Sequence, residues 1–305
     1  MEVQVEVSES LAEAPFLSLT PDLIPEQGEP MPVALRRIAE TTYSGQIEIA
    51  AETPSGLRTA VFSARDRAGN RGTAVEAGET LLIDTEGPRV TDLTITPADP
   101  IRNAPAPVTV DVSLSLSSDL APDTTPDLTW RIDGDGQATD PAPIDLIEAE
   151  PRVWTGSLTL PATAGAAAPA ALVLEPSATD DLGNPSAPLA GGNRFQVYQG
   201  ELPPLEVPAG LAAEALPGGA VQLTWQPVDG AADYQLYRTA PGEADLLPLA
   251  RSAGATELTD TTETDGLHRY AVASVRSANG QEGLSAPSAV VEALADGTPP
   301  EPPPG

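Results

Sequence analysis

The chain has 305 residues, a length typical of two or three domains, and 40% of its residues are hydrophobic. Its 45 acidic and 15 basic residues give a formal net charge of −30, which excludes binding to nucleic acid and to anionic membranes. Cysteine is absent, which excludes disulfides, thiolate metal sites and cysteine nucleophiles.

Composition also limits the source and the secondary structure. Every basic residue is Arg, which fits either adaptation to high salt or a GC-rich genome, and both indicate a bacterium. The 34 Pro and 26 Gly divide the chain into short pieces, which favours β-strands over long helices. We expect no membrane insertion, because no stretch approaches the roughly 18 apolar residues of a membrane helix. The N-terminus does not resemble a signal peptide.

The first strand is predicted where Val3, Val5 and Val7 alternate with polar residues. This stretch, "VQVEVSES" (3–10), is similar to "VTVDVSLS" (108–115), which indicates two copies of one unit. The second copy has an additional strand before this block, "RVTDLTIT" (89–96). We therefore expect the first copy to lack its first strand and to carry an unpaired sheet edge, and the parent protein to continue upstream.

Two further blocks support the repeat. "PVALRRIAETTYSGQIEI", from Pro32, aligns with "PIDLIEAEPRVWTGSLTL", from Pro143. At one offset the paired residues are Pro32 with Pro143, Leu35 with Leu146, Tyr43 with Trp154, and Gly45 with Gly156. "SARDRAGN" (63–70) and "SATDDLGN" (177–184) each predict a hairpin turn between the last two strands, since Gly allows positive φ and Asp or Asn caps the turn.

These motifs resemble the bacterial immunoglobulin-like domains that occur in tandem on exported proteins. The resemblance covers about residues 1–199 and includes the connector "IDTEGPRV" (83–90), similar to the joins between such domains. One departure is Pro176, which falls in a strand that should be central, where Pro is disfavoured. The strand register around it is therefore left open.

From about residue 201 the pattern changes and resembles a fibronectin type III domain over 203–294. Trp225 matches the family's core tryptophan, and Tyr270, Val272 and Val275 match its sixth strand. His268 replaces the tyrosine of the family's "tyrosine corner", and we expect its imidazole to bond nearby backbone in place of that hydroxyl and to bind no metal.

Two acidic clusters are the candidate metal sites. Asp133, Asp135 and Asp140 could offer oxygen ligands to Ca²⁺, but Gly136 comes too early for an EF-hand loop, and the stretch favours an Asp-Gly hairpin tip. A calcium ion at the first domain junction, held by Asp84 with Asp66 or Glu86, is the second possibility. We assign no metal ligand and no cofactor.

Catalysis is not expected. The single His268 has no convincing serine partner, because Gly283 and Ser285 lie outside the Gly-x-Ser-x-Gly pattern of a nucleophile elbow. Phosphate-binding and dinucleotide-binding loops are absent from the sequence. The few aromatic residues leave little for a carbohydrate-binding cleft beside a carboxylate pair.

The predicted fold is all-β: three tandem β-sandwiches, two immunoglobulin-like and one of fibronectin type III, in an elongated array. The expected domains are 1–85, 86–200 and 201–296, followed by a Pro-rich linker at 297–305. The connectors "IDTEGPRV" and "YQGELPPLEVP" (198–208) are short and contain Pro, which limits folding back and favours an elongated rod.

The favoured function is a non-catalytic spacer or adhesive segment of a larger bacterial surface protein, extracellular or periplasmic, with a protein or polysaccharide partner at the cell surface and further domains upstream and downstream. Two alternatives stay open. One is a set of accessory modules of a secreted hydrolase, and the other is a subunit of a surface filament or secretion apparatus.

Overall fold

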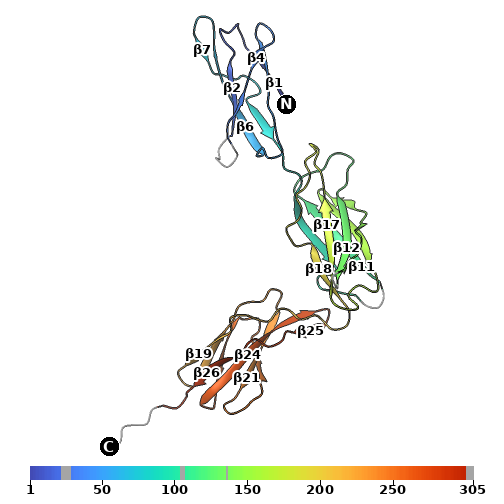
Figure 1. Ribbon diagram of the computed structural model, residues 1–305, viewed down its shortest axis with the longest axis vertical. Coiled ribbons are helices and arrows are strands. Elements are labelled where there is room, and N and C mark those ends of the chain that lie inside the picture. The colour runs from blue at the N-terminus through green and yellow to red at the C-terminus, as the bar shows by residue number, and fades with distance from the viewer. Residues whose placement is uncertain (22–28, 104–106, 135–136, 300–305) are drawn as a thin grey trace, which may run out of the picture.

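The computed structural model describes residues 1–21, 29–103, 107–134 and 137–299. Every regular element in these ranges is a β-strand, and the strands form three β-sandwiches in chain order (Figure 1). The fold is therefore all-β, as the sequence predicts. The three sandwiches follow one another in an elongated array, as the sequence predicts, and the third turns away from the line of the first two in Figure 1.

The first sandwich packs a three-stranded sheet, in the order β1-β5-β4, against a sheet in the order β3-β2-β6-β7, with β8 also paired to β6. Its strands are β1 (Glu2–Glu6), β2 (Phe16–Pro21), β3 (Met31–Val33), β4 (Arg36–Arg37), β5 (Thr42–Gln46), β6 (Gly56–Arg65), β7 (Arg71–Gly72) and β8 (Thr80–Ile83). Its core is small, with Leu17, Leu19, Val33 and Ile47 buried between the sheets.

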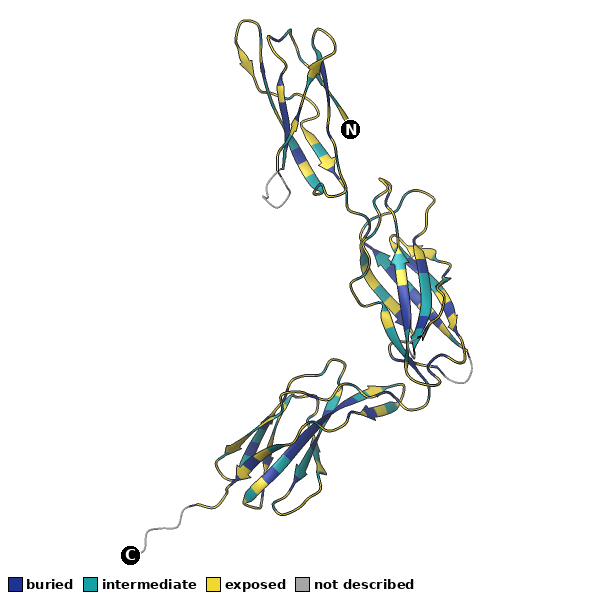
Figure 2. Ribbon diagram, viewed as in Figure 1, coloured by how far each residue is buried: buried dark blue, intermediate teal, exposed yellow. Residues whose placement is uncertain are grey.

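The second sandwich has a four-stranded sheet, β15-β16-β11-β9, and a sheet in the order β10-β18-β17-β12-β13, with β14 also paired to β12. Its strands are β9 (Val90–Thr96), β10 (Ile101–Arg102), β11 (Val108–Leu116), β12 (Asp127–Gly134), β13 (Gln137–Ala138), β14 (Ala142–Pro143), β15 (Ile147–Glu150), β16 (Val153–Leu160), β17 (Ala170–Ser177) and β18 (Arg194–Tyr198). Figure 2 shows buried residues along the strands of its sheets.

The third sandwich has a three-stranded sheet, β19-β20-β23, and a sheet in the order β22-β21-β24-β25, with β26 also paired to β24. Its strands are β19 (Ala212–Leu216), β20 (Ala220–Thr224), β21 (Asp233–Thr239), β22 (Leu247–Arg251), β23 (Glu257–Thr261), β24 (Gly266–Ala278), β25 (Gln281–Leu284) and β26 (Val291–Ala295). Trp225 is in the core and meets Tyr234 edge to face, with ring centroids 5.5 Å apart.

The strand pairing fixes how the first two sandwiches correspond. Ser18 is opposite Pro32 and Thr129 is opposite Pro143, so the aligned prolines occupy the same position. The alignment of the first strands is different from the one that the sequence suggested. Val3 is opposite Gly45, and the residue opposite Gly156 is Val112, so Val3 corresponds to Val112 and not to Val108.

The repeated glycine has a steric cause. A Cβ on Gly156 would lie 2.6 Å from the backbone oxygen of Asp145 and 2.8 Å from Ile144 Cγ2. A Cβ on Gly45 would lie 2.7 Å from Val33 Cγ1, in the corresponding segment of the first sandwich. In each sandwich a neighbouring segment crosses directly over the strand, and only a residue without a side chain lets it pass.

The register at Pro176 follows from where the neighbouring strand ends. Pro176 is opposite Leu128 in β12, within the sheet. Leu174, two residues earlier, donates its N–H to Asn193 on the β18 side, beyond which β18 has no paired residue. An N–H at residue 176 would point to the same empty side, so the proline breaks no ladder hydrogen bond.

We predict that Gly156→Ala destabilises the second sandwich by about 1–3 kcal/mol, because the added methyl group must displace packed backbone and side chains. Urea unfolding followed by tryptophan fluorescence measures this change, since Trp154 lies in the same strand. Gly191→Ala is the control, because a Cβ there meets no atom within 4 Å. Equal stability of the two variants would contradict the steric account.

Candidate functional site

His268 lies in β24 and is 1% exposed. Its Nε2 is 2.8 Å from the Thr264 carbonyl oxygen, and its ring stacks on that of Tyr270. The imidazole therefore bonds nearby backbone, as the sequence led us to expect. Its Nδ1 has no hydrogen-bond partner among the described residues.

A buried polar cluster beside this histidine was not predicted. Asp260 is 7% exposed, accepts a hydrogen bond of 2.9 Å from the Tyr270 hydroxyl, and accepts two from Arg238 Nη1 at 3.0 and 2.8 Å. Burial, reinforced by the bond to Asp260, raises the pKa of Tyr270 above its usual range. The hydroxyl therefore remains a donor, and the cluster links β21, β23 and β24 inside the third sandwich.

The candidate calcium loop of the second sandwich forms a hairpin. Asp133 is opposite Ala138, so β12 and β13 pair on either side of the tip, and the Asp133 carboxylate lies 2.8 Å from the Arg194 guanidinium. Asp140 is exposed, and Asp135 lies outside the described residues. The flanking strands therefore pair as the favoured Asp-Gly hairpin requires, and its tip, 135–136, lies outside the described residues.

The proposed calcium pairing of Asp84 with Asp66 is wrong. Asp84 follows β8, whose last residue, Ile83, is opposite Gly56 at the start of β6, whereas Asp66 follows the other end of β6. The length of β6 separates the two carboxylates. Asp84 instead accepts the Glu86 N–H at 3.1 Å, and the Glu86 carboxylate pairs with Arg89.

The serine considered as a nucleophile has a structural contact. Ser285 is 6% exposed, and its hydroxyl oxygen accepts the Ser274 N–H at 3.0 Å. Gly283 lies against the chain that enters the third sandwich, since a Cβ there would be 2.8 Å from the Leu202 carbonyl oxygen.

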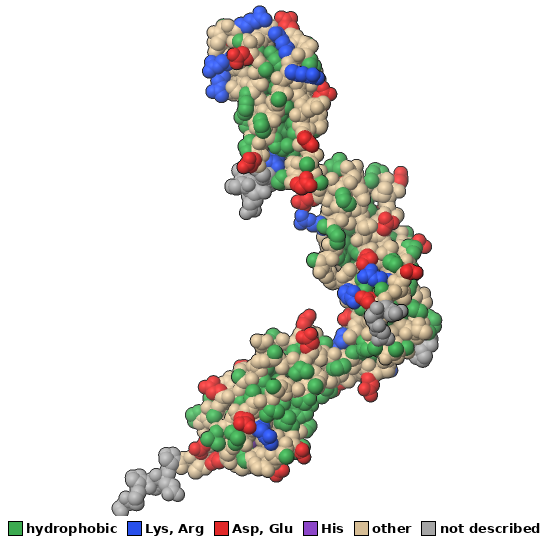
Figure 3. All heavy atoms as spheres, viewed as in Figure 1, with side chains coloured by type: hydrophobic (Ala, Val, Ile, Leu, Met, Phe, Trp, Pro, Cys, Tyr) green, Lys and Arg blue, Asp and Glu red, His purple; other side chains and the backbone are tan. Residues whose placement is uncertain are grey.

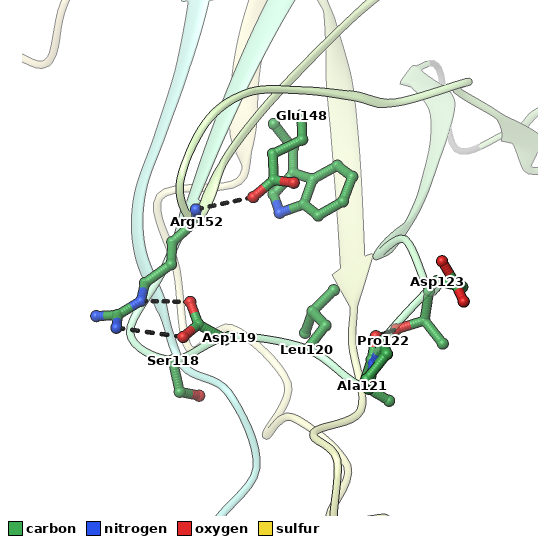
Figure 4. A pocket seen from close by; sticks show the side chains of 10 residues that line it. Ser118, Asp119, Leu120, Ala121, Pro122, Asp123, Glu148 and Arg152 are labelled. Carbon is green, nitrogen blue, oxygen red and sulfur yellow. Dashed lines mark hydrogen bonds and ion pairs between the residues drawn. The ribbon is translucent and has the colours of Figure 1, made fainter.

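A shallow cavity of about 240 Å³ opens on the second sandwich between the loop 118–124 and β15–β16 (Figure 4). Arg152 lies on its wall and pairs with Asp119 at 2.8 Å. Hydrogen bonding from Arg152 holds the pKa of Asp119 below its usual range. Both side chains of this pair are exposed, so it contributes little to stability, and we assign the cavity no ligand.

The first joint of the array contacts the repeated hairpin. Asn184 Nδ2 donates to the Asp84 carbonyl oxygen at 3.2 Å. Gly87 lies so close to the hairpin that a Cβ on it would be 2.2 Å from the Pro185 carbonyl oxygen. On the other side, Thr85 Oγ1 donates to the Thr53 carbonyl oxygen at 2.6 Å. The connector 84–87 is thus bound by the first and the second sandwich.

The second joint has more contacts, and they cross directly between sandwiches. Asn279, in the turn between β24 and β25, donates from Nδ2 to the Pro100 carbonyl oxygen at 2.8 Å and to the Tyr198 hydroxyl at 3.2 Å. The Tyr198 hydroxyl donates to Gln281 Oε1 at 3.0 Å. Arg276 donates to Gln196 Oε1 at 2.6 Å.

Some residues of this joint are also shielded from solvent. Tyr198 is 1% exposed, and the adjoining Leu202 is 4% exposed. Breaking a hydrogen bond in such surroundings costs free energy, because the separated donor and acceptor would be buried without a partner. The joint is therefore the most extensively built polar site between the sandwiches in the part of the chain that the structure describes.

The positively charged side chains are unevenly distributed over the surface. Figure 3 shows arginine side chains gathered at the end of the first sandwich that points away from the second. This end carries β4, with Arg36 and Arg37, and the β6–β7 hairpin, with Arg65 and Arg71.

No protein-family profile and no curated protein matches the chain. Similar solved structures include the FN1–FN3 domains of chicken CNTN1, at 9% identity over 96% of this chain and 94% of that chain, with a TM-score of 0.32. Domains A168–A170 of titin match at 14% identity over 96% and 98%, with a TM-score of 0.30.

An Fn3-like protein from Clostridium thermocellum matches at 29% identity over 29% of this chain and 90% of that chain, with a TM-score of 0.25. The chain is a tandem array of immunoglobulin-like and fibronectin type III-like sandwiches, an assignment that follows from its strand order. Within the described residues, no helix has the length and hydrophobicity needed to cross a membrane.

We predict that Asp180→Asn lowers the melting temperature of the second sandwich at pH 7. Burial raises the pKa of Asp180, but hydrogen bonds from Asn184 and from the Leu182 and Gly183 backbone outweigh it, so the pKa lies below its usual value. A depressed pKa contributes stability above the unfolded pKa of about 3.9, and this stability is lost as the pH falls through the folded value.

The difference in melting temperature between wild type and Asp180→Asn should therefore shrink from pH 5 to pH 2. Calorimetry across this range measures it. Asp181→Asn, at the exposed neighbouring residue, is the control and should change little. A difference that stays constant down to pH 2 would argue against the hairpin carboxylate as its source.

Proposed function

We propose that this chain is a non-catalytic spacer in a larger bacterial protein of the cell surface or periplasm, which holds a binding partner at a fixed distance and angle. The observation that carries the proposal is the second joint, where Asn279, Tyr198 and Arg276 connect two sandwiches through directed hydrogen bonds. A flexible tether does not require hydrogen bonds between its domains, whereas a spacer of defined geometry needs them to fix the angle between its domains.

The stiffness of the joint has a local basis in the third sandwich. Asn279 has a φ of 52°, a left-handed conformation that Asn adopts more readily than most residues. This conformation makes the tight turn between β24 and β25 and directs the amide to the second sandwich. The turn is therefore held in place by the hairpin to which it belongs. In this hairpin β24 and β25 pair from Val275, opposite Leu284, to Ala278, opposite Gln281.

The surface charge supports the same role. At −30 the sandwiches repel one another wherever their surfaces are not built to meet, which opposes collapse into a compact particle. We propose a protein or polysaccharide of the cell surface as the partner that is presented. The like charge also keeps neighbouring copies apart at low and moderate salt.

We predict that Asn279→Gly loosens the second joint without unfolding the third sandwich, because Gly adopts the same positive φ but lacks the amide. Spin labels on Ser157→Cys and Thr259→Cys, exposed sites on the second and third sandwiches, report the distance between them. The chain has no native cysteine to interfere. Pulsed electron resonance should give one narrow distance distribution for the wild type and a broader one for Asn279→Gly.

The matched control is Gln235→Ala, which removes an amide that donates two hydrogen bonds and accepts a third from Arg251, all inside the third sandwich. It should leave the distribution unchanged. A broad distribution in the wild type, equal to that of Asn279→Gly, would refute the spacer of fixed geometry.

A further inference from the structure

One sheet of the first sandwich has an outer surface without charge. The sheet contains β2, β6 and β8, and Leu17 and Leu19 of β2 point into the core, so the alternate residues of these strands point outwards. The outward residues of β2, of β6 from Leu57 to Ser63, and of β8 are either large and apolar or Ser and Thr. We call this surface the neutral face.

The apolar members of the neutral face are open to solvent. Phe16 is 54% exposed, Leu57 40%, Val61 46% and Leu82 68%. Strand pairing brings them onto one surface, because Leu57 is opposite Leu82, and Phe16 is opposite Ser63, two residues after Val61. An apolar patch of this kind on a soluble protein is typical of an interaction site.

The corresponding surface of the second sandwich is charged. The aligned prolines fix the correspondence of β2 with β12, and strand pairing then fixes that of β6 with β17. Phe16 corresponds to Asp127, and Val61 corresponds to Glu175. Two threonines of the neutral face correspond to arginines, Thr20 to Arg131 and Thr80 to Arg194.

Segments that precede a sandwich leave this surface open. In the second sandwich β9 joins the other sheet, and β10 extends the corresponding sheet at its edge, beyond β18. With these segments in place, Asp127, Glu175 and Arg194 of the corresponding surface are exposed. A domain or a strand before β1 would therefore leave the neutral face uncovered.

We propose that the neutral face binds the neutral face of a second copy of this chain, with the two sheets packed face to face and the two first sandwiches running in opposite directions. Two chains of net charge −30 repel wherever their acidic surfaces meet. Two neutral faces meet without like charges in contact and without burying an unpaired charge. A surface that binds an identical surface forms a closed, two-fold dimer.

Charges at the two ends of the neutral face determine the direction. At the outer end Arg65 is exposed, and Arg71 reaches over the face, where its Nε donates to Ser63 Oγ at 3.0 Å. At the end nearest the second sandwich, the exposed Asp84 directly follows β8. An antiparallel dimer brings the arginines of one copy to Asp84 of the other, whereas a parallel dimer would bring arginine to arginine. The two-fold axis then crosses the middle of β6, beside Val61.

The size of the neutral face indicates a weak dimer. Strands about 4.8 Å apart with a rise of about 3.3 Å per residue give this sheet a neutral area of about 500 Å². Two such faces bury about 1,000 Å² in total, the lower limit for a specific interface. Repulsion between the acidic chains opposes the contact at low salt, and added salt screens that repulsion. High salt and a high local concentration of chains therefore favour the dimer.

Sedimentation equilibrium of the full chain tests the contact. From about 10 to about 300 µM protein, the wild type should follow a monomer–dimer equilibrium without larger species. The dimer should be tighter in about 1 M NaCl than in about 0.15 M NaCl, because the Debye length falls from about 8 to about 3 Å.

Two variants locate the contact on the neutral face. Val61→Glu should weaken the dimer at least about tenfold in 1 M NaCl, because burying two carboxylates near the axis has a desolvation cost that salt does not remove. Phe16→Asp should weaken it as well. Each introduces the residue that the second sandwich has at the corresponding position, so the fold accommodates it. Thr259→Glu adds the same charge at an exposed site of the third sandwich and should leave the dimer unchanged.

Cross-linking tests the direction. Leu57 and Ser63 lie on either side of the axis, so the antiparallel dimer brings Leu57 of one copy opposite Ser63 of the other. A mixture of the Leu57→Cys and Ser63→Cys variants should be joined by a thiol cross-linker about 10 Å long, the spacing of packed sheets. Each variant alone should give little product, since its two identical sites lie about 20 Å apart. The chain has no native cysteine to compete.

Several results would overturn the proposal. A chain that stays monomeric in 1 M NaCl is one, and a dimer that Val61→Glu leaves unchanged is another. A dimer that weakens as salt rises would show that charged surfaces form the contact, and cross-linking of Leu57→Cys to itself would contradict the antiparallel direction. These results are independent of the spacer function, because Val61→Glu should leave the distance distribution between the second and third sandwiches as narrow as that of the wild type.

Discussion

The unpaired edge of a β-sheet is the constraint on which the rest of this structure depends. A strand edge exposes hydrogen-bonding groups and the rim of the core, and a stable sandwich must cover them. In the second sandwich the cover is β9, which the connector 84–87 brings into place by resting on the hairpin that ends in Asn184. Covering the edge and joining the sandwiches are therefore performed by one segment in the second sandwich.

Local signals in the sequence predicted much of this arrangement. The hairpins at 63–70 and 177–184 are visible because Asp, Gly and Asn are required within a few residues of one another. Gly45 and Gly156 are visible because each lies two residues after an aromatic residue. The register of β1 was misjudged, since valines that alternate along a strand give several equally good alignments, and only the partner strand selects Val112 over Val108.

The contacts at the joints could not be predicted from the sequence. Asn279 meets the carbonyl oxygen of Pro100, and the two are 179 residues apart with no pattern linking them. Asp66 and Asp84 are close in the sequence, yet they lie at opposite ends of β6, so the calcium pairing failed for a purely geometric reason. Contacts between domains depend on the path of the chain, and composition does not reveal that path.

Amide hydrogen exchange measured residue by residue along β1 and β11 tests the central claim most directly. We expect alternation in β1 and at Val7 directly after it: the Val5 and Val7 amides are protected by pairing with β5 and the segment before it, and the Gln4 and Glu6 amides exchange rapidly. In β11, by contrast, consecutive amides should all be protected, because β9 and β16 pair on either side. Alternation also distinguishes an open edge from fraying, which would expose every amide of β1. Equal protection of Gln4 and Val5 would show that the edge is covered and would contradict the account.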